Sequence, residues 1–470
     1  MVKRFSGLKR AAIGLRTIAI VPAQIVFLTL YLGLMAGRQT IEVQVSPEVK
    51  SVRFLIDGRD AAVIEAAPWS ANVNFGPPFE PHELVAVAYD RDGDETGRTS
   101  QIINLPRPPA ELTIGLETVE SDEQKVPVAA ALRWEHVFAA KPSDATIRID
   151  GQKIRVDAAF RARLPRLDAA HPHVIAAEMR FDDGFVARRE LVIAGGAVAD
   201  SVSTELTPVA FSGKPPEKFD GCLTSNGGPV ETREVETPEA DVFIVREPDL
   251  TEVRTVLDPR RITALGSQNS LLTRHWASLD PGTTMRYVWP VAQLVAESGH
   301  IPSSIFEMSV VISSSDAGML TFLTNSYDSA NRVVRRSVRD PKNNPRRFAD
   351  AVAVAGVNAI TGAHRRAVVL LLSRTPDASG AQPAGVRHYL STVGVPLFVW
   401  SLTGPRPDLS TSWGEVDDIS TAPRFQAAVQ RLRASLASQH IVWIASDPIK
   451  ALRVDADPRC GITPLARLGH

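Results

Sequence analysis

Cysteine is nearly absent from this chain, and so is any excess of one charge. The 470 residues hold two cysteines, Cys222 and Cys460, which excludes zinc ribbons, iron–sulfur proteins and disulfide-dense small domains. The 52 basic residues almost balance the 53 acidic ones, for a formal net charge of −1, so no overall field directs the chain toward nucleic acid. What remains is an ordinary globular protein, 44% hydrophobic and 22% charged, whose length favours about three domains.

Catalytic and cofactor motifs are also missing. The sequence contains no G-x-S-x-G, H-E-x-x-H, C-x-x-C, G-x-G-x-x-G or GK[ST] pattern. His171 and His173 flank a proline beside a predicted strand, which favours a structural role. The acidic run 90–95 favours a hairpin turn over a calcium loop, because the rest of the EF-hand spacing is lacking. We therefore predict no enzymatic activity, no metal and no cofactor.

One long apolar run is present, near the N-terminus. Residues 17–37 are uncharged, 21 residues in all, and no comparable run follows; this length is enough to span a bilayer. Five basic residues precede the run: Lys3, Arg4, Lys9, Arg10 and Arg16. This flank predicts that residues 1–38 are a signal peptide or a membrane anchor, and that the body is exported to a periplasmic, cell-envelope or extracellular location. Cleaved signal and uncleaved anchor stay open, and a buried helix of a soluble domain is the less favoured alternative.

Two tandem Ig-like β-sandwiches are predicted, over residues 39–106 and 110–195. Both stretches show short runs of alternating apolar and polar residues separated by turn signals. Ile56-Asp57-Gly58 recurs as Ile149-Asp150-Gly151, and the strand beginning at His82 recurs at His173. The distance to the next Asp-Gly turn is 35 residues in the first copy and 33 in the second, which indicates an internal repeat.

The rest of the chain contains two segments that differ in composition and in hydrophobic periodicity. Residues 196–238 are rich in Gly, Pro, Ser and Thr without strong periodicity, so we predict a linker. From 239 to 456, continuous apolar runs such as DVFIV (241–245), AVVLLLS (367–373) and IVWIA (441–445) alternate with helix-like patterns. This alternation predicts a doubly wound, Rossmann-type α/β domain with a mostly parallel sheet. Residues 457–470 are expected to be a C-terminal tail.

The α/β part resembles the von Willebrand factor type A family, of the secreted bacterial kind that carries Ig-like segments ahead of this domain. DVFIV is similar to the first strand of that family. FADAVAVAGVNAITGAHRRAVVLLLSRTPDAS (348–379) is similar to its helix, basic pair, central strand and loop, and RFQAAVQRLRASLASQHIVWIASDP (424–448) to its last helix, last strand and exit. The resemblance covers about half of the chain.

The metal site that the resemblance implies is lost from the sequence. The family's ligands are a D-x-S-x-S loop, a Thr and an Asp, whereas this chain has Arg246, Pro248 and Leu250 in the first loop and Arg374 in the third. The second loop, 343–347, offers no Thr at the matching place. Hard cations need oxygen ligands, so we predict a degenerate, metal-independent site. Either these arginines are a solvated surface, or Arg246, Arg346 and Arg374 converge and bind a partner's carboxylate.

Two functions from different classes follow. The first is a non-enzymatic exported protein that mediates protein–protein interaction or adhesion through the type A-like domain, with another protein as partner, no nucleic acid, and membrane contact only through the N-terminal segment. The second is a scaffolding component of an envelope assembly that uses the edges of the sandwiches. Exposed apolar residues at the strand-tip loops would favour the first, and at the sandwich edges the second.

The two cysteines bracket the α/β domain. The resemblance implies a disulfide between Cys222 and Cys460, since some type A domains are closed by a disulfide between their flanks. An even pair in an exported protein agrees with this prediction. Two unpaired thiols are the alternative.

Overall fold

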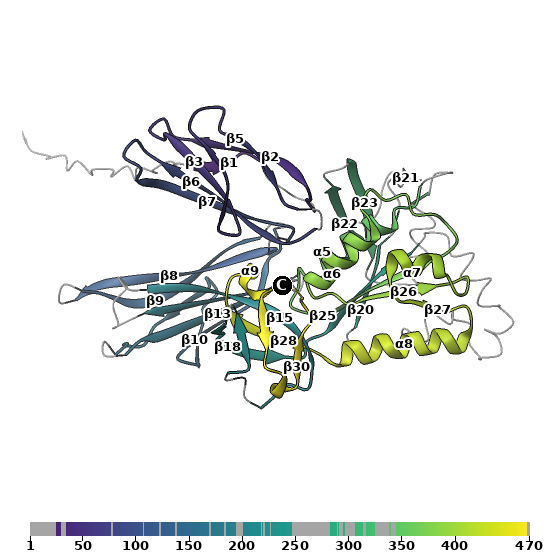
Figure 1. The fold of residues 1–470 in the computed structure, drawn as a ribbon. Coiled ribbons are helices and arrows are strands. Elements are labelled where there is room, and N and C mark those ends of the chain that lie inside the picture. The colour runs from purple at the N-terminus through teal and green to yellow at the C-terminus, as the bar shows by residue number, and fades with distance from the viewer. Residues whose placement is uncertain are drawn as a thin grey trace, which may run out of the picture. The chain divides into compact units, whose positions relative to one another are not determined.

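Figure 1 shows the fold of the chain in a computed structural model. It describes residues 25–29, 34–246 (without 77–78, 107, 122–123, 137–138, 169–170, 183–184, 194–200, 218, 220 and 226), 283–288, 290, 295–296, 306–313, 316–324, 338–339 and 345–467. The described residues fall into two compact units. The first comprises those within 1–30, 40–73 and 84–101, and the second comprises all others.

The N-terminal region is a β-sandwich of a three-stranded and a four-stranded sheet. The strand orders are β1-β2-β5 and β4-β3-β6-β7. The strands are β1 (Ile25–Phe27), β2 (Arg38–Val45), β3 (Ser51–Ile56), β4 (Arg59–Ile64), β5 (Ser70–Asn74), β6 (His82–Tyr89) and β7 (Glu95–Ile103). Alternate side chains point into the core: Ile41 and Val43 from β2, and Val52 and Phe54 from β3, are at most 3% exposed. This period of two is what a half-buried antiparallel strand requires.

The next region repeats this sandwich strand for strand. Its sheets have the orders β12-β9-β8 and β11-β10-β13-β14. The strands are β8 (Ala110–Ser121), β9 (Gln124–His136), β10 (Pro142–Ile149), β11 (Gln152–Ile154), β12 (Arg161–Arg163), β13 (His173–Phe181) and β14 (Val186–Ile193). The two β-sandwiches predicted from the sequence are thereby confirmed as an architecture.

The sequence repeat extends to the register of the strands. Ile56 of β3 lies opposite Leu84 of β6, and Ile149 of β10 lies opposite Ile175 of β13. Each partner stands two residues after the histidine that marked the repeat. In both copies the Asp and Gly of the turn have positive φ, 52° and 76° for Asp57-Gly58 and 49° and 81° for Asp150-Gly151. Positive φ at both positions is the requirement of a type I′ hairpin, which explains the repeated Asp-Gly pair.

The predicted membrane span over residues 17–37 is not one continuous helix. Ile25–Phe27 forms β1 and pairs antiparallel with β2, Ile25 opposite Val45. Leu34 and Met35, from the end of the run, are 4% and 7% exposed. The other residues of the predicted segment, 1–24 and 30–33, lie outside the described residues. Among the residues that the structure does describe, no helix is long and apolar enough to cross a membrane.

The predicted linker over residues 196–238 is wrong. The segment contains four strands, namely β15 (Ser201–Gly213), β16 (Leu223–Ser225), β17 (Gly228–Pro229) and β18 (Thr232–Glu236). The first part of β15 pairs with β14, through Ile193 opposite Ser201. Its second part pairs with β28 (Gln439–Ala445), through Val209 opposite Val442. One strand thus extends the sheet of the second sandwich into the C-terminal region, in the order β11-β10-β13-β14-β15-β28-β18.

A five-stranded parallel sheet forms the α/β part, in the order β20-β19-β25-β26-β27. The strands are β19 (Ala240–Val245), β20 (Thr284–Val288), β25 (Arg365–Leu372), β26 (Leu397–Ser401) and β27 (Val416–Asp418). All six residues of β19 and all eight of β25 are buried, as expected for strands covered on both faces.

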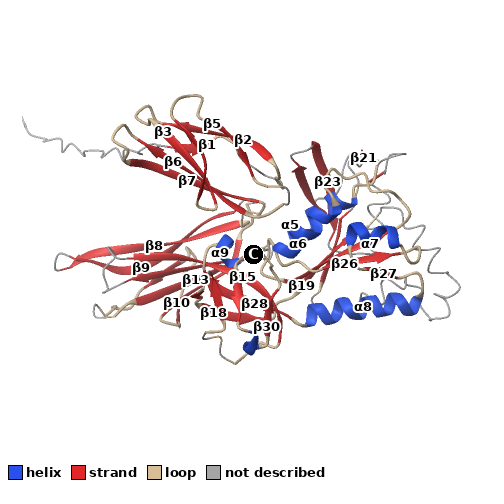
Figure 2. Ribbon diagram, viewed as in Figure 1, coloured by secondary structure: helices blue, strands red, loops and turns tan. Residues whose placement is uncertain are grey.

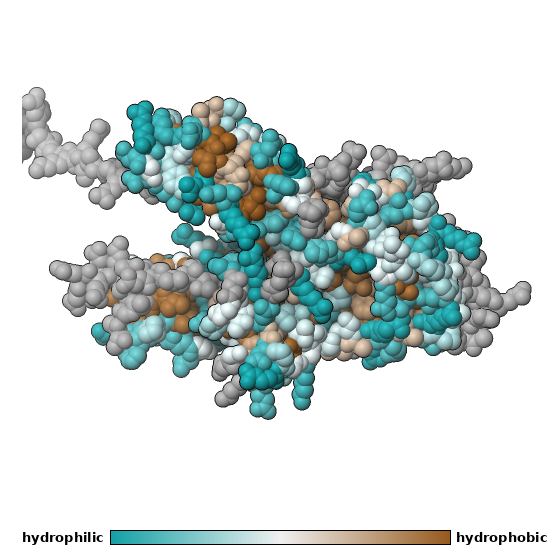
Figure 3. Space-filling view, in the orientation of Figure 1, coloured by the Kyte–Doolittle hydropathy of each residue, from teal (hydrophilic) through white to brown (hydrophobic). Residues whose placement is uncertain are grey.

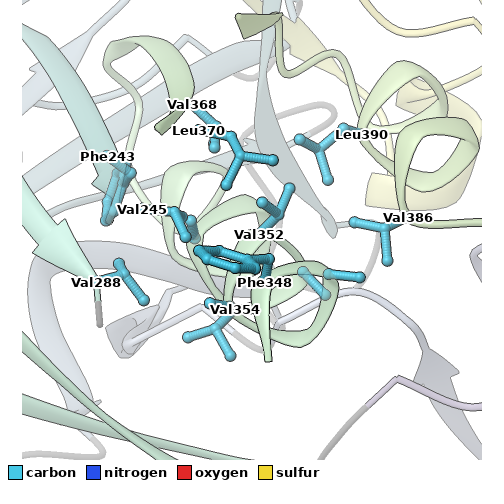
Figure 4. Close-up of a cluster of buried hydrophobic side chains, with 14 of the residues drawn as sticks. Phe243, Val245, Val288, Phe348, Val352, Val354, Val368, Leu370, Val386 and Leu390 are labelled. Atoms are coloured by element: carbon cyan, nitrogen blue, oxygen red, sulfur yellow. The ribbon is translucent and has the colours of Figure 1, made fainter. Parts of the chain in front are cut away.

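Helices cover both faces of this sheet (Figure 2). One face carries α5 (Phe348–Ala359), α6 (Pro383–Thr392) and α7 (Pro407–Trp413), and the other carries α8 (Ala422–Ala437). Figure 4 shows Phe348 and Val352 of α5 gathered with Val245 and Leu370 of the sheet, all 0% exposed. On the other face Trp400 packs edge-on against Phe425 of α8, with ring centroids 5.9 Å apart. Of these helices, α5 and α8 lie in the stretches that the sequence patterns indicated, and α6 and α7 were not predicted.

The predicted last strand of the α/β domain belongs elsewhere. The run IVWIA lies in β28, which pairs antiparallel with β15 and β18 and is not part of the parallel sheet. The residues that follow β28 stay with this antiparallel part. They form α9 (Pro448–Ala451), β29 (Val454–Ala456), the 3₁₀ turn η2 (Pro458–Cys460) and β30 (Ile462–Pro464). The predicted boundary at residue 456 and the predicted tail at 457–470 are corrected accordingly, since β30 pairs with β15.

Short strands complete the described part of the chain. β22 (Phe306–Ser313) pairs with β23 (Asp316–Thr324), and β21 (Val295–Ala296) pairs with β24 (Val338–Arg339).

Candidate functional site

The three arginines proposed as a ligand site lie in segments that follow β19, precede α5 and follow β25. Because β19 and β25 are parallel and adjacent, with Val245 opposite Leu370, Arg246 and Arg374 both lie at the carboxyl edge of the sheet. Arg246 is only 2% exposed, however, and its backbone N–H donates to the carbonyl of Val288 at 3.2 Å. A guanidinium this deeply buried cannot meet a partner protein, so this member of the predicted site is wrong.

The other two arginines are more accessible. Arg346 is half-buried and its carbonyl accepts a hydrogen bond from the Ala378 N–H at 2.7 Å. Arg374 is exposed. Of the three predicted residues, Arg374 alone presents an exposed side chain at this edge.

The loop after β25 is used to cap α5. The helix begins after Arg347, whose side chain makes no capping bond. Instead, Asp377 accepts hydrogen bonds from the N–H groups of Phe348 at 2.9 Å and Ala349 at 3.2 Å. These are N–H groups of the first turn, which have no partner within the helix, and the carboxylate also complements the helix dipole.

Asp350 of α5 in turn binds the loop that follows β25. Its carboxylate accepts from the Gly380 N–H at 3.1 Å and the Ala381 N–H at 3.0 Å, and pairs with Arg347 at 2.6 Å. The acidic residues of this edge thus bind backbone donors and an arginine. Among the residues that the structure describes, no group of three or more His, Cys, Asp and Glu is placed to hold a metal ion.

The opposite, amino edge of the sheet explains the basic pair of the sequence. Arg365 donates to the carbonyl of Leu436 at 3.3 Å, and Arg366 donates to the carbonyl of Gly394 at 3.1 Å. These carbonyls lie at the C-terminal ends of α8 and α6, where cations are favoured. Burial lowers the pKa of Arg366 to about 10. The basic pair therefore ties two helix ends to β25 and does not face a ligand.

A charged cluster on the long sheet was not found from the sequence. Arg188 of β14, with a side chain 9% exposed, pairs with Glu178 at 2.9 Å, Glu234 at 3.1 Å and Glu236 at 2.6 Å. Its guanidinium lies 4.2 Å from the ring centroid of Trp443, which itself donates to Glu236 at 3.1 Å. The cluster joins β13 and β14 to β18 and β28 across the sheet. One feature of the sequence could have indicated this cluster: Glu234 and Glu236 have the spacing of two that places side chains on one face of a strand. Both lie in the stretch interpreted as a linker.

The candidate disulfide is present. Cys222 and Cys460 are joined, with an S–S distance of 2.07 Å and Cα atoms 5.9 Å apart. The bond lies in a small core with Phe219, Leu223 and Val454, next to the pairing of β16 with β29. It therefore fastens the antiparallel part around β15 and β28, where the sequence had suggested a clamp on the α/β domain itself.

Exposed large apolar side chains lie on the β-strands. In the described part of the chain they occur on or directly after β1, β4, β8, β9 and β18, and none occurs in the loops at the carboxyl edge of the parallel sheet. They are Val26 (38%), Leu28 (52%), Val63 (52%), Val119 (49%), Val128 (37%) and Val235 (36%).

Comparison with known proteins gives no family assignment. No family model matches the chain, and no curated protein matches it. Among solved structures, fibronectin(III)-like modules of CbhA from Clostridium thermocellum are 22% identical, over 17% of this chain and 92% of theirs, with a TM-score of 0.16. The central fibronectin-III array of RIM-binding protein is 10% identical, over 43% of this chain and 81% of its own, with a TM-score of 0.18. The Bacteroides ovatus protein SGBP-B, solved with a mixed-linkage heptasaccharide, is 10% identical over 67% and 95%, with a TM-score of 0.13. These scores are too low to support an argument about fold or function.

Proposed function

We propose that this chain is a non-enzymatic, exported protein that binds another protein through the edges of its β-sandwiches, as a scaffolding component of an envelope assembly. The observation that carries the proposal is the position of the exposed apolar residues. Val63 lies on the edge strand β4 and Val119 on the edge strand β8. Edge strands offer unpaired backbone groups to a partner chain, and apolar side chains beside them add area that association can bury.

The disulfide supports the exported location. Disulfides persist in oxidising compartments and are rare in the cytosol. The two cysteines form one bond and leave no unpaired thiol in the chain. Burial of Cys222 at 4% exposure places that sulfur inside the core, as expected of a structural bond.

Adhesion through a metal-independent type A-like domain is the second candidate. The parallel sheet with helices on both faces supports the resemblance, although β28 departs from it. Arg374, exposed at the carboxyl edge, is the residue that favours this candidate, because ligands of open α/β sheets bind at that edge.

Site-specific photo-crosslinking in intact cells distinguishes the two candidates. A photoreactive residue is placed at Val63, Val119 or Arg374 of the full chain, one at a time, and adducts are analysed by mass spectrometry. We expect one shared partner from the sandwich positions and none from Arg374. Adducts from Arg374 alone would favour the type A-like domain, and absence of adducts from all three positions would contradict both candidates.

A further inference from the structure

The β10–β11 hairpin of the second sandwich places two cations directly opposite each other. Arg148 of β10 lies opposite Lys153 of β11, and both side chains are exposed. Ile149 and Gln152 flank the two-residue turn and form the hydrogen-bonded pair. Arg148 and Lys153 are therefore the next, non-hydrogen-bonded pair, in which side chains lie closest. Like charges in this position destabilise a sheet.

The equivalent hairpin of the first sandwich carries an ion pair instead. The Asp-Gly turns of the two copies align, so Asp60 of β4 is the equivalent of Lys153; each stands two residues after the glycine. Asp60 lies 3.6 Å from Arg53 of β3, and the residue directly opposite it is Leu55. The same turn thus accommodates a favourable arrangement of charge, and the hairpin itself does not impose the like-charge pair on the second copy.

The carboxylates near the like-charge pair are engaged elsewhere. Asp150 of the turn lies 2.7 Å from Nδ1 of His173. Asp157, which follows β11, accepts a hydrogen bond from the N–H of Arg161 at 2.9 Å, and Asp144 of β10 lies opposite an arginine of β13. Among the described residues, neither cation of the pair forms an ion pair with another side chain. Its repulsion is therefore uncompensated in the described part of the chain.

The same hairpin forms an open edge of the long sheet. β11 stands at one end of the strand order, and β10 is its neighbour there. Because Gln152 and Ile154 face the hydrogen-bonding positions of β10, the backbone N–H and carbonyl of Lys153 point away from the sheet. An edge with outward backbone groups can accept a further strand.

Further positive charge flanks this edge. Arg155 follows β11, and Arg163 lies on β12, the edge strand of the other sheet; both are exposed. β12 lies on the same side of the sandwich as β11, because β8, at the far end of its sheet, packs against β14. Figure 3 shows hydrophilic surface where Figure 1 labels β10. The edge therefore combines backbone groups for a strand with cations for an acidic one.

We propose that an acidic segment of a partner protein adds to β11 as the next strand of the long sheet. Its backbone pairs with Lys153, and carboxylates at every second residue lie over Arg148 and Lys153, where they relieve the repulsion. This inference rests on the proposed function, in which sandwich edges bind protein, and it adds one edge and the chemistry of the partner that this edge accepts.

An end-blocked, fluorescent peptide of alternating Thr and Glu tests the proposal by anisotropy with the full chain. We expect binding that weakens as salt is raised, and binding of the Thr-Gln peptide that is at least about tenfold weaker. The N–H groups of a strand alternate between its two edges. N-methylation of all glutamates or of all threonines should therefore abolish binding in one case and preserve it in the other.

Lys153→Glu separates binding from stability. The variant should bind the Thr-Glu peptide at least about fivefold more weakly. Its melting temperature should rise, because a glutamate opposite Arg148 makes an attractive cross-strand pair. Lys50→Glu is the matched control, since Lys50 is an exposed lysine of the first sandwich outside its strands; it changes the net charge equally and should bind like wild type.

Three results would overturn the inference. They are no binding of the Thr-Glu peptide, equal binding by Lys153→Glu and wild type, or equal effects of the two N-methylation patterns. Binding of dextran sulfate without binding of the peptide would also overturn it and would assign the surface to an anionic polysaccharide. Such a failure is separable from failure of the proposed function, which is judged by the adducts formed at Val63 and Val119.

Discussion

The two sandwiches share a register and a turn, but their sheets end differently. In the first, the four-stranded sheet ends at β7 among the described strands, whereas in the second the equivalent strand β14 is followed by β15, β28 and β18. The same local pattern of residues therefore makes a closed module in one place and part of a longer sheet in the other. The difference lies in the strands that follow the last strand of the sandwich. In the second sandwich, residues 201–213 pair with β14, and residues 439–445 then pair with residues 201–213.

The extended sheet joins the second sandwich to the C-terminal region. Arg188 and Trp443 meet across it, although they are far apart in the sequence. The first part of β15 pairs with β14 and its second part pairs with β28, so we expect these regions to unfold together. The predictions below compare the second sandwich and the C-terminal region with the first sandwich.

The largest effect is expected from Phe211→Ala. Phe211 of β15 and Phe54 of β3 are both at most 1% exposed, and removal of a buried phenyl ring costs about 3–5 kcal/mol of unfolding free energy. Hydrogen exchange should rise across β13, β14, β15 and β28 in Phe211→Ala, and only across β2–β7 in Phe54→Ala. If hydrogen exchange rises only in β15 of Phe211→Ala, the sheet is not a cooperative unit.

Removal of the disulfide is expected to have the next largest effect. Cys222 and Cys460 close a loop with a sequence separation of 238, and loss of such a bond costs about 2–5 kcal/mol, mainly through the unfolded chain. The variant Cys222→Ala with Cys460→Ala should unfold at lower denaturant concentration in the C-terminal region, while signals from the first sandwich stay unchanged. Addition of reductant should lower the denaturant concentration at which the wild type unfolds to that of the variant. Reductant should not change the unfolding of the variant.

A smaller effect is expected from Arg188→Met. The change leaves Glu178, Glu234 and Glu236 without the cation they share, and we expect a loss of about 1–3 kcal/mol because the guanidinium is 9% exposed. The matched change is Arg98→Met in the first sandwich, where the pair with Glu95 is 57% and 43% exposed; because solvent screens this pair, we expect a smaller loss of stability than in Arg188→Met. Equal losses of thermal stability would contradict a role for the Arg188 cluster as a joint.

The sequence predicted the sandwiches because their signals are local. An Asp-Gly pair that needs positive φ and an alternation of period two are readable within a few residues. The central parallel strands were predicted for a similar reason, since burial on both faces leaves continuous apolar runs.

The same rule misled the interpretation of β28. Val442 and Ile444 face one core of the antiparallel part, and Ile441 and Trp443 face another, so this antiparallel strand also reads as a continuous apolar run. A strand buried on both faces and a strand of a parallel sheet have the same sequence pattern. Likewise, an uncharged run over 17–37 does not reveal that Ile25–Phe27 pairs with a strand that begins at residue 38.

Arg246 was misassigned for a tertiary reason. Arg246 has the residue type of an exposed side chain, but it lies at the end of a strand whose six residues are all buried. The capping of α5 by Asp377 joins residues 29 apart. Neither the burial of a charged side chain nor a hydrogen bond between residues this far apart can be predicted from the local sequence.

The smallest effect is expected at two equivalent histidines, His82 of the first sandwich and His173 of the second. In the first copy, His82 Nε2 lies 3.0 Å from the carbonyl oxygen of Phe75. In the second, both ring nitrogens of His173 face acceptors, Nδ1 at 2.7 Å from the Asp150 carboxylate and Nε2 at 2.9 Å from the Asp168 carbonyl oxygen. The doubly protonated ring is the form that can donate to both.

The hydrogen bond to Asp150 accordingly raises the pKa of His173 above its usual 6.5, and the hydrogen bond from His173 lowers the pKa of Asp150. Because the folded pKa of His173 is the raised one, its contribution to stability is complete below pH 6.5 and is lost as the pH rises through the folded value. We expect NMR titration to give His173 a pKa above 6.5 in the wild type and a lower pKa in Asp150→Asn than in the wild type. The matched change Asp57→Asn should leave the His173 titration where it was. A His173 pKa that does not respond to Asp150→Asn would show that the second copy has no ion pair at this corner.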